Sequence, residues 1–198
     1  MIFQQATSDQ RELYGGAIHA TVPIRFIDVA QIRRIPDHQE LLVDDKTDQS
    51  IIIELLERQE HVPDDQSIQF HFNVVADESD VAPDKRLILN QRQLTSADMP
   101  HFANSVPKYI LKARQMVAKF NETAENTVNV YMAIIRLERC KTDLLITYNE
   151  PVLLAPNSSS VNAVGGTVPS TSEHDAEQLF IRLLSSIKIV DYSLFQNQ

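Results

Sequence analysis

The stretch TVNVYMAIIRLERCKTDLLITY, residues 127–148, decides the fold. Its two apolar parts, 127–137 and 143–148, are separated by a polar connection around Arg139, Cys140 and Lys141. Two β-type runs joined by a short polar connection predict a β-hairpin. Because a hairpin pairs its strands in opposite directions, this segment predicts an antiparallel sheet.

Further strands are expected upstream of the hairpin. The residues after Lys85 and the segment 109–120 have β-type patterns, and 41–43 is a short apolar run. The run 50–57 begins with three consecutive isoleucines, whose β-branched side chains pack well on a pleated surface. Its second half, Glu-Leu-Leu-Glu, would also suit a helix, so the strand is the preferred of two interpretations. Residues 1–12 look like a loose polar leader.

Two longer helices are expected. Residues 64–77 follow Pro63 and place apolar side chains at roughly helical spacing. Residues 175–189 have a stronger pattern at that spacing, formed by Ala176, Leu179, Phe180, Leu183, Leu184 and Ile187. Asp28 is also expected to cap a short helix over 29–33.

The expected fold class is α+β, with a central mostly antiparallel sheet covered by helices. The 198 residues are long enough for one domain with a sizeable core, so we expect a single domain over 1–198. Residues 155–173 are rich in Ser, Asn, Gly and Pro, and we expect a flexible loop there.

The composition excludes several classes of partner. The chain has 27 acidic and 18 basic residues and a net charge of -9, which disfavours nucleic acid and anionic lipid. No apolar run approaches the roughly 20 residues of a membrane helix, and the start carries no signal-peptide pattern. A single cysteine, Cys140, permits no intramolecular disulfide. We therefore expect an intracellular protein whose partner presents a positively charged surface.

Motifs for catalysis, metal or nucleotide binding are missing from the sequence. The six histidines are scattered without metal-ligand spacing, and Gly15-Gly16 fits neither phosphate-binding motif. There is no GxSxG elbow. Basic neighbours could lower the pKa of Cys140, but a structural thiol is the favoured interpretation. We expect no metal and no cofactor.

The strongest functional signal is the placement of acidic residues. Between Asp28 and Asp65 the chain has 11 acidic and 4 basic residues. A merely solvated face is the ordinary explanation of such a cluster. However, Glu54 and Glu57 lie within an apolar segment, and Asp37 follows a proline, which favours a charged patch with an apolar floor, as in protein interfaces.

Several stretches resemble the Mog family of Ran guanine-nucleotide release factors. They are LYGGAI at 13–18, FIDV at 26–29, IPDHQE at 35–40, SIIIELLE at 50–57 and KTDLLITYNEP at 141–151. The resemblance covers essentially the whole chain, its motifs are specific in order and spacing, and it is weakest over 155–173.

The resemblance implies an α/β/α sandwich with an antiparallel sheet of about six strands, similar to the PsbP photosystem protein. It implies a non-enzymatic factor that binds the small GTPase Ran, promotes loss of its GTP and supports nuclear protein import. We expect it in the nucleus and also the cytoplasm, as a monomer without a cofactor. A binding module without exchange activity and an enzyme with an unrecognised site remain as alternatives.

The family's Ran-binding carboxylates correspond to five acidic residues of this chain. We expect these five side chains to converge on one surface, although they come from separate segments. They are Asp28, Asp37, Glu40, Glu54 and Glu57.

Overall fold

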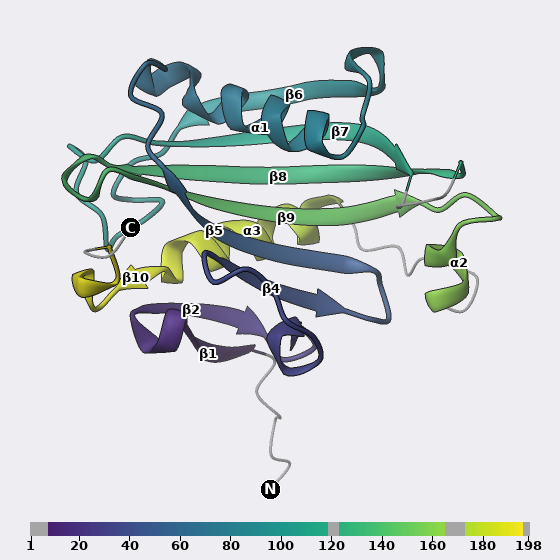
Figure 1. Ribbon diagram of the computed structural model, residues 1–198, viewed down its shortest axis with the longest axis horizontal. Coiled ribbons are helices and arrows are strands. Elements are labelled where there is room, and N and C mark those ends of the chain that lie inside the picture. Colours follow the sequence, from purple (N-terminus) through teal and green to yellow (C-terminus); the bar gives the residue numbers. More distant parts are fainter. Residues whose placement is uncertain (1–7, 119–122, 165–172, 196–198) are drawn as a thin grey trace, which may run out of the picture.

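The computed structural model describes residues 8–118, 123–164 and 173–195 (Figure 1). Seven strands belong to the larger sheet: β3 (Ile27–Asp28), β4 (Gln39–Asp44), β5 (Gln49–Glu57), β6 (Arg86–Gln93), β7 (Lys108–Ala118), β8 (Glu125–Leu137) and β9 (Thr142–Leu153). Three belong to a smaller sheet: β1 (Ser8–Leu13), β2 (Ile18–Pro23) and β10 (Lys188–Ile189). The helices are α1 (Ser67–Glu78), α2 (Ser159–Ala163) and α3 (Glu173–Ser186).

The larger sheet confirms the predicted α+β architecture. Its strand order is β3-β4-β5-β9-β8-β7-β6, and that of the smaller sheet is β1-β2-β10. Every one of these pairings is antiparallel. Helix α1 lies on one side of the large sheet, whereas α3 and the smaller sheet lie on the other (Figure 1). The sequence did not predict the second sheet.

The predicted hairpin forms the centre of the large sheet. Strands β8 and β9 pair from Leu137↔Thr142 outward, and a 3₁₀ turn over Glu138–Cys140 connects them. Lys141 ends this turn in the left-handed region, with a φ of 49°. Almost every residue of both strands is buried, on alternate faces of the sheet. The hairpin therefore requires apolar cover on both sides.

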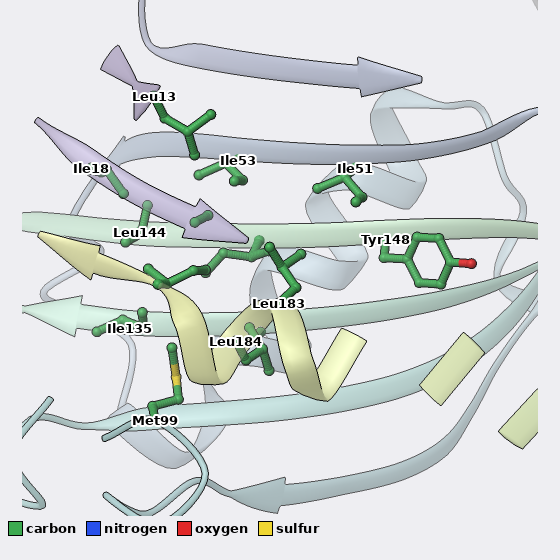
Figure 2. Packing of buried hydrophobic residues seen from close by; sticks show 14 of the residues in the cluster. Leu13, Ile18, Ile51, Ile53, Met99, Ile135, Leu144, Tyr148, Leu183 and Leu184 are labelled. Atoms are coloured by element: carbon green, nitrogen blue, oxygen red, sulfur yellow. The ribbon is translucent and has the colours of Figure 1, made fainter. Parts of the chain in front are cut away.

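The cover on the α3 side forms the larger core. Figure 2 shows Leu183 and Leu184 of α3 among side chains of the large sheet, including Ile53, Leu144 and Ile135. Leu183 is 1% exposed. The predicted helix over 175–189 is confirmed up to Ser186, because its apolar stripe is buried against the sheet as its spacing requires. Its predicted end is wrong, since Lys188–Ile189 pair with β2 as strand β10.

The cover on the opposite side is the smaller core beneath α1. Ile68 and Phe72 of α1 pack on sheet residues Leu111, Met132 and Leu145. The predicted helix over 64–77 is confirmed, although its first residues, Asp64–Gln66, form a 3₁₀ turn.

The ambiguous run 50–57 is strand β5. Ile51, Ile53 and Leu55 are buried in the α3-side core, while the alternate residues face the α1 side. Glu54 is one of these alternate residues, so its carboxylate projects on the α1 side.

A buried charge network ties α1 to the hairpin. Arg136 of β8 is 1% exposed, and its Nε lies 3.0 Å from a carboxylate oxygen of Asp143. The other oxygen of Asp143 lies 3.0 Å from Nε2 of His71 on α1. Burial would raise the pKa of Asp143, but hydrogen bonds from His71, the Gln59 backbone N–H and Arg136 outweigh burial and lower it. These partners are needed, because a buried charge left alone is strongly destabilising.

Two N-terminal expectations need revision. The expected polar leader over 1–12 is wrong for Ser8–Leu13, which form β1; residues 1–7 lie outside the described residues. Most side chains of β1 are exposed, so its sequence has no apolar pattern typical of a strand. The segment forms a strand because it pairs with β2. Asp28 does act as a cap, accepting a hydrogen bond from the Ala30 N–H, but the capped element is only the 3₁₀ turn Val29–Gln31.

The stretch 155–173 also differs from a simple loop, because it contains α2. Ser158 and Ser160 are fully buried there, and Asn126 of β8 donates a hydrogen bond to Ser160. Polar composition alone could not reveal that these hydroxyls have partners. Residues 165–172 of the expected loop, and 119–120 of the expected strand 109–120, lie outside the described residues.

Leu183→Ala is expected to lower the free energy of unfolding by about 2–5 kcal/mol, because it leaves a cavity in the α3-side core. Urea denaturation measures this change. Leu179→Ala is the matched control, since Leu179 is on the same helix but only partly buried, and it should cost less. Equal unfolding midpoints for the wild type and Leu183→Ala would contradict the packing of α3.

Candidate functional site

Two of the predicted site residues, Asp28 and Glu40, are neighbours. Asp28 of β3 pairs with Leu42, and Glu40 of β4 pairs with Ile53. Residues directly opposite each other in an antiparallel pair lie on the same face, so both carboxylates project on the α3 side. Burial raises the pKa of Glu40, and the nearby charge of Asp28 raises it further.

Glu40 is held by the turn before β2. The backbone N–H of Tyr14 donates a hydrogen bond to a carboxylate oxygen of Glu40. The Tyr14 hydroxyl donates to the carbonyl oxygen of Ile53 at 2.7 Å, and the carbonyl oxygen of His38 lies 3.0 Å from the same hydroxyl. Tyr14 therefore connects the start of β4 to β5 through hydrogen bonds.

Gly15 and Gly16 make this turn possible. Both adopt positive φ angles, 65° and 93°, directly after Tyr14, whose own φ is 50°. Glycine adopts such angles without a steric penalty. The glycine pair therefore serves backbone geometry, and the turn places the Tyr14 N–H against Glu40.

Glu54 lies on the other face of the same strand pair. It pairs with Gln39, whose side-chain amide donates to it at 2.9 Å. Burial raises the pKa of the Tyr14 hydroxyl, and the charges of Glu40 and then Glu54 raise it further. Tyr14 is thus close enough to interact with both carboxylates, although they project on opposite sides of the sheet.

Asp37 and Glu57 are both exposed. Asp37 lies in the turn before β4 and Glu57 is the last residue of β5. The Leu55 N–H donates to the His38 carbonyl at 2.9 Å, so the chain before β4 continues beside the end of β5. Within the described residues, neither carboxylate has a side-chain hydrogen bond or ion pair.

The five carboxylates therefore lie on β3, β4, β5 and the turn before β4, at one margin of the large sheet, and we call them the acidic edge. The expected single surface is too simple a description. Glu40 and Glu54 lie on opposite faces because β4 pairs Gln39, not Glu40, with Glu54. A partner of the whole acidic edge would have to wrap around this margin.

A cleft beside the acidic edge was missed by the sequence analysis. It has a volume of about 510 Å³ and lies on the α1 side of the sheet, with Glu54 in its lining. Its other lining residues come from β4, β5, β7, β8, β9 and α1, spread over positions 43–151. No local motif could have revealed it. We call it the sheet cleft.

Other kinds of site receive no support from the described residues. They contain no group of three or more His, Cys, Asp or Glu side chains arranged to hold a metal ion. Burial raises the pKa of the Cys140 thiol, the opposite of what an activated nucleophile needs. No helix in the described part of the chain is long and apolar enough to cross a membrane.

Comparison with known proteins identifies the family. Residues 11–151 match the family model described as Ran-interacting Mog1 protein. A probable Ran guanine nucleotide release factor from Dictyostelium discoideum is 56% identical, over 96% of this chain and 97% of the relative. The human Ran guanine nucleotide release factor is 32% identical, over 94% of this chain and 96% of the relative.

A solved structure agrees with these relatives. The crystal structure of the Saccharomyces cerevisiae Ran-binding protein Mog1p superposes with a TM-score of 0.70 at 28% identity, over 95% of this chain and 98% of that one. Sequence and fold together establish that this chain belongs to the Ran-interacting Mog1 family.

Proposed function

We propose that this protein binds the small GTPase Ran through the acidic edge and promotes release of its guanine nucleotide, in support of nuclear protein import. Family membership and the names of the relatives support the partner and the activity. The structural observation that best supports the acidic edge as the binding site concerns Asp37 and Glu57. Both are exposed and have no side-chain partner within the described residues.

Binding can drive release without any chemical step. A factor that prefers nucleotide-free Ran over nucleotide-bound Ran must weaken nucleotide affinity by the same ratio. A coupling free energy of about 3 kcal/mol corresponds to a weakening of roughly a hundredfold. The protein accordingly acts as a non-enzymatic factor, as a monomer in the nucleus and cytoplasm.

The acidic edge suits a basic partner surface. Asp37 and Glu57 can pair with lysine or arginine without first breaking an internal ion pair. Glu40 and Glu54 are already positioned by Tyr14 and Gln39, so little further ordering of these side chains is needed on binding. The basic residues of Ran that help hold its nucleotide-binding loops are the partners we assign to them.

Fluorescent-nucleotide release from GTP-loaded Ran separates this proposal from a binding module without exchange activity. The proposal requires that adding the protein accelerates loss of the nucleotide. Binding without acceleration would favour the module, and no binding at all would remove Ran as the partner.

Asp37→Lys and Glu57→Lys should each weaken Ran binding and nucleotide release sharply while leaving the melting temperature nearly unchanged. Losing a well-desolvated charge pair costs about 2–5 kcal/mol, and the new like charge adds repulsion. Titration calorimetry and thermal melts measure the two effects. Raising the salt concentration should weaken wild-type binding as well, since the Debye length is about 8 Å at physiological ionic strength.

Asp84→Lys is the matched control for these charge reversals. Asp84 is exposed in the turn Pro83–Lys85 between α1 and β6, has no side-chain hydrogen bond or ion pair in the described residues, and is outside both the acidic edge and the sheet cleft. Glu125 would be a poor control because it forms an ion pair with Lys85. Normal Ran binding by both edge variants, or equal loss in Asp84→Lys, would show that the acidic edge is merely solvated.

Glu40→Gln separates stability from binding. The glutamine keeps an acceptor for the Tyr14 N–H but removes the negative charge of Glu40. Burial and the nearby charge of Asp28 make that charged form unfavourable. Because the folded pKa of Glu40 is raised, its stabilising contribution is complete below the unfolded value, about 4.3, and is lost as pH rises through the folded value. The variant should therefore match or exceed wild-type stability at pH 7, and this advantage should vanish at acidic pH.

The same variant should bind Ran more weakly than the wild type, since its carboxylate is part of the acidic edge. Chemical denaturation at pH 7 and at pH 3.5, together with a Ran titration, tests both statements. A variant that is less stable at pH 7 would contradict the raised pKa, and unchanged Ran affinity would remove Glu40 from the interface.

A further inference from the structure

The α1 side of the large sheet is only partly covered. Helix α1 packs mainly on β7 and β8 and also reaches Leu145 of β9. Figure 1 shows α1 in front of the upper strands, with no helix in front of β5 and β4. The strands β5 and β4, and β9 beyond Leu145, thus present an open face to one side of α1. The sheet cleft lies there and extends onto the ends of β7 and β8.

The cleft combines an apolar floor with acidic walls. Val43 of β4 and Ile52 of β5 are half-buried in its floor, and Val75 of α1 forms part of its side. Its lining includes four carboxylates and no lysine or arginine: Asp44, Asp45, Asp48 and Glu54. Asp44 is neutralised by Arg25 at 3.0 Å, whereas Asp45 is exposed to solvent.

A buried hydroxyl in the cleft lining has no hydrogen-bond partner. Thr147 of β9 is 3% exposed, and its Oγ1 bonds to nothing in the described residues. Its cross-strand neighbours are Ile52 and Met132, both apolar. An unpaired buried hydroxyl is unfavourable, and valine would fill the same space without that cost.

Glu54 lies close enough to Thr147 for one ligand group to contact both side chains. Glu54 lies two residues beyond Ile52 on β5, which makes it the diagonal neighbour of Thr147 on that face. Diagonal neighbours are about 7–8 Å apart, a gap that one ammonium or guanidinium group can bridge. An aliphatic stem of lysine or arginine would then lie on the apolar floor.

We propose that the sheet cleft receives a basic segment of the bound GTPase and inserts one lysine or arginine between Thr147 and Glu54. This inference rests on the proposed function and adds a second contact region to the acidic edge. Glu54 makes the two regions continuous. The open face of three strands is about 14 Å wide, enough for one helix, about 10–12 Å across, or for one extended segment.

Val43→Lys and Thr147→Val test the cleft with nucleotide-free Ran. Val43→Lys places a like charge on the floor and should weaken Ran binding at least about tenfold, because like charges brought together in an interface are strongly unfavourable. Thr147→Val removes one acceptor and should weaken binding by about five- to tenfold, the scale of one hydrogen bond. The melting temperature of Thr147→Val should not fall, since the hydroxyl has no internal partner.

Leu87→Lys is the matched control, because Leu87 is a strand residue, 61% exposed on β6 and outside the cleft. Its affinity should stay at the wild-type value. A photo-crosslinking amino acid at Ser79, which lines the cleft from the end of α1, should join to a Ran peptide that contains lysine or arginine. A crosslinked peptide without either residue would overturn the proposal.

The outcomes separate the two proposals. If the wild-type protein does not bind Ran, the proposed function fails. If the wild type binds and both cleft variants bind equally well, only the cleft proposal is overturned. If Val43→Lys unfolds, Thr147→Val alone decides, and unchanged affinity for that variant would refute the insertion of a cationic side chain.

Discussion

The structure depends on burying the β8–β9 hairpin on both of its faces. Because side chains alternate along a strand, two strands that are apolar at nearly every position need an apolar layer on each side. Helix α3 with the small sheet supplies one layer, and α1 supplies the other. The Arg136–Asp143–His71 network holds α1 to the hairpin by satisfying charges that would otherwise be destabilising.

The two layers are unequal, and both proposed contact regions follow from that difference. The layer on the α3 side spans β5, β9 and β8, whereas α1 covers β7, β8 and only part of β9 and leaves the sheet cleft open. The outer strands β3 and β4 have less apolar surface to bury, so they can carry exposed and half-buried carboxylates. Tyr14 and its glycine turn keep this polar margin in place by bonding to Glu40 and to the carbonyl of Ile53.

Much of the fold was predictable because its main elements have strong local patterns: the 127–148 hairpin, the isoleucine run at 51–53 and the apolar stripe of α3. Strand β1 was not, since its polar sequence forms a strand only beside β2. The acidic residues were found from charge density and family resemblance, but their division between two faces depends on the β4–β5 register. The cleft was hidden because distant residues such as Val43 and Thr147 assemble it.

The central claim is that the protein favours the nucleotide-free form of Ran. The most direct measurement is its dissociation constant for nucleotide-free Ran and for GTP-loaded Ran, by calorimetry in the same buffer. The account predicts tighter binding to the nucleotide-free form, by the same factor by which the protein weakens GTP binding to Ran. Equal affinity for the two forms would contradict it, because a ligand without differential affinity cannot shift the nucleotide equilibrium.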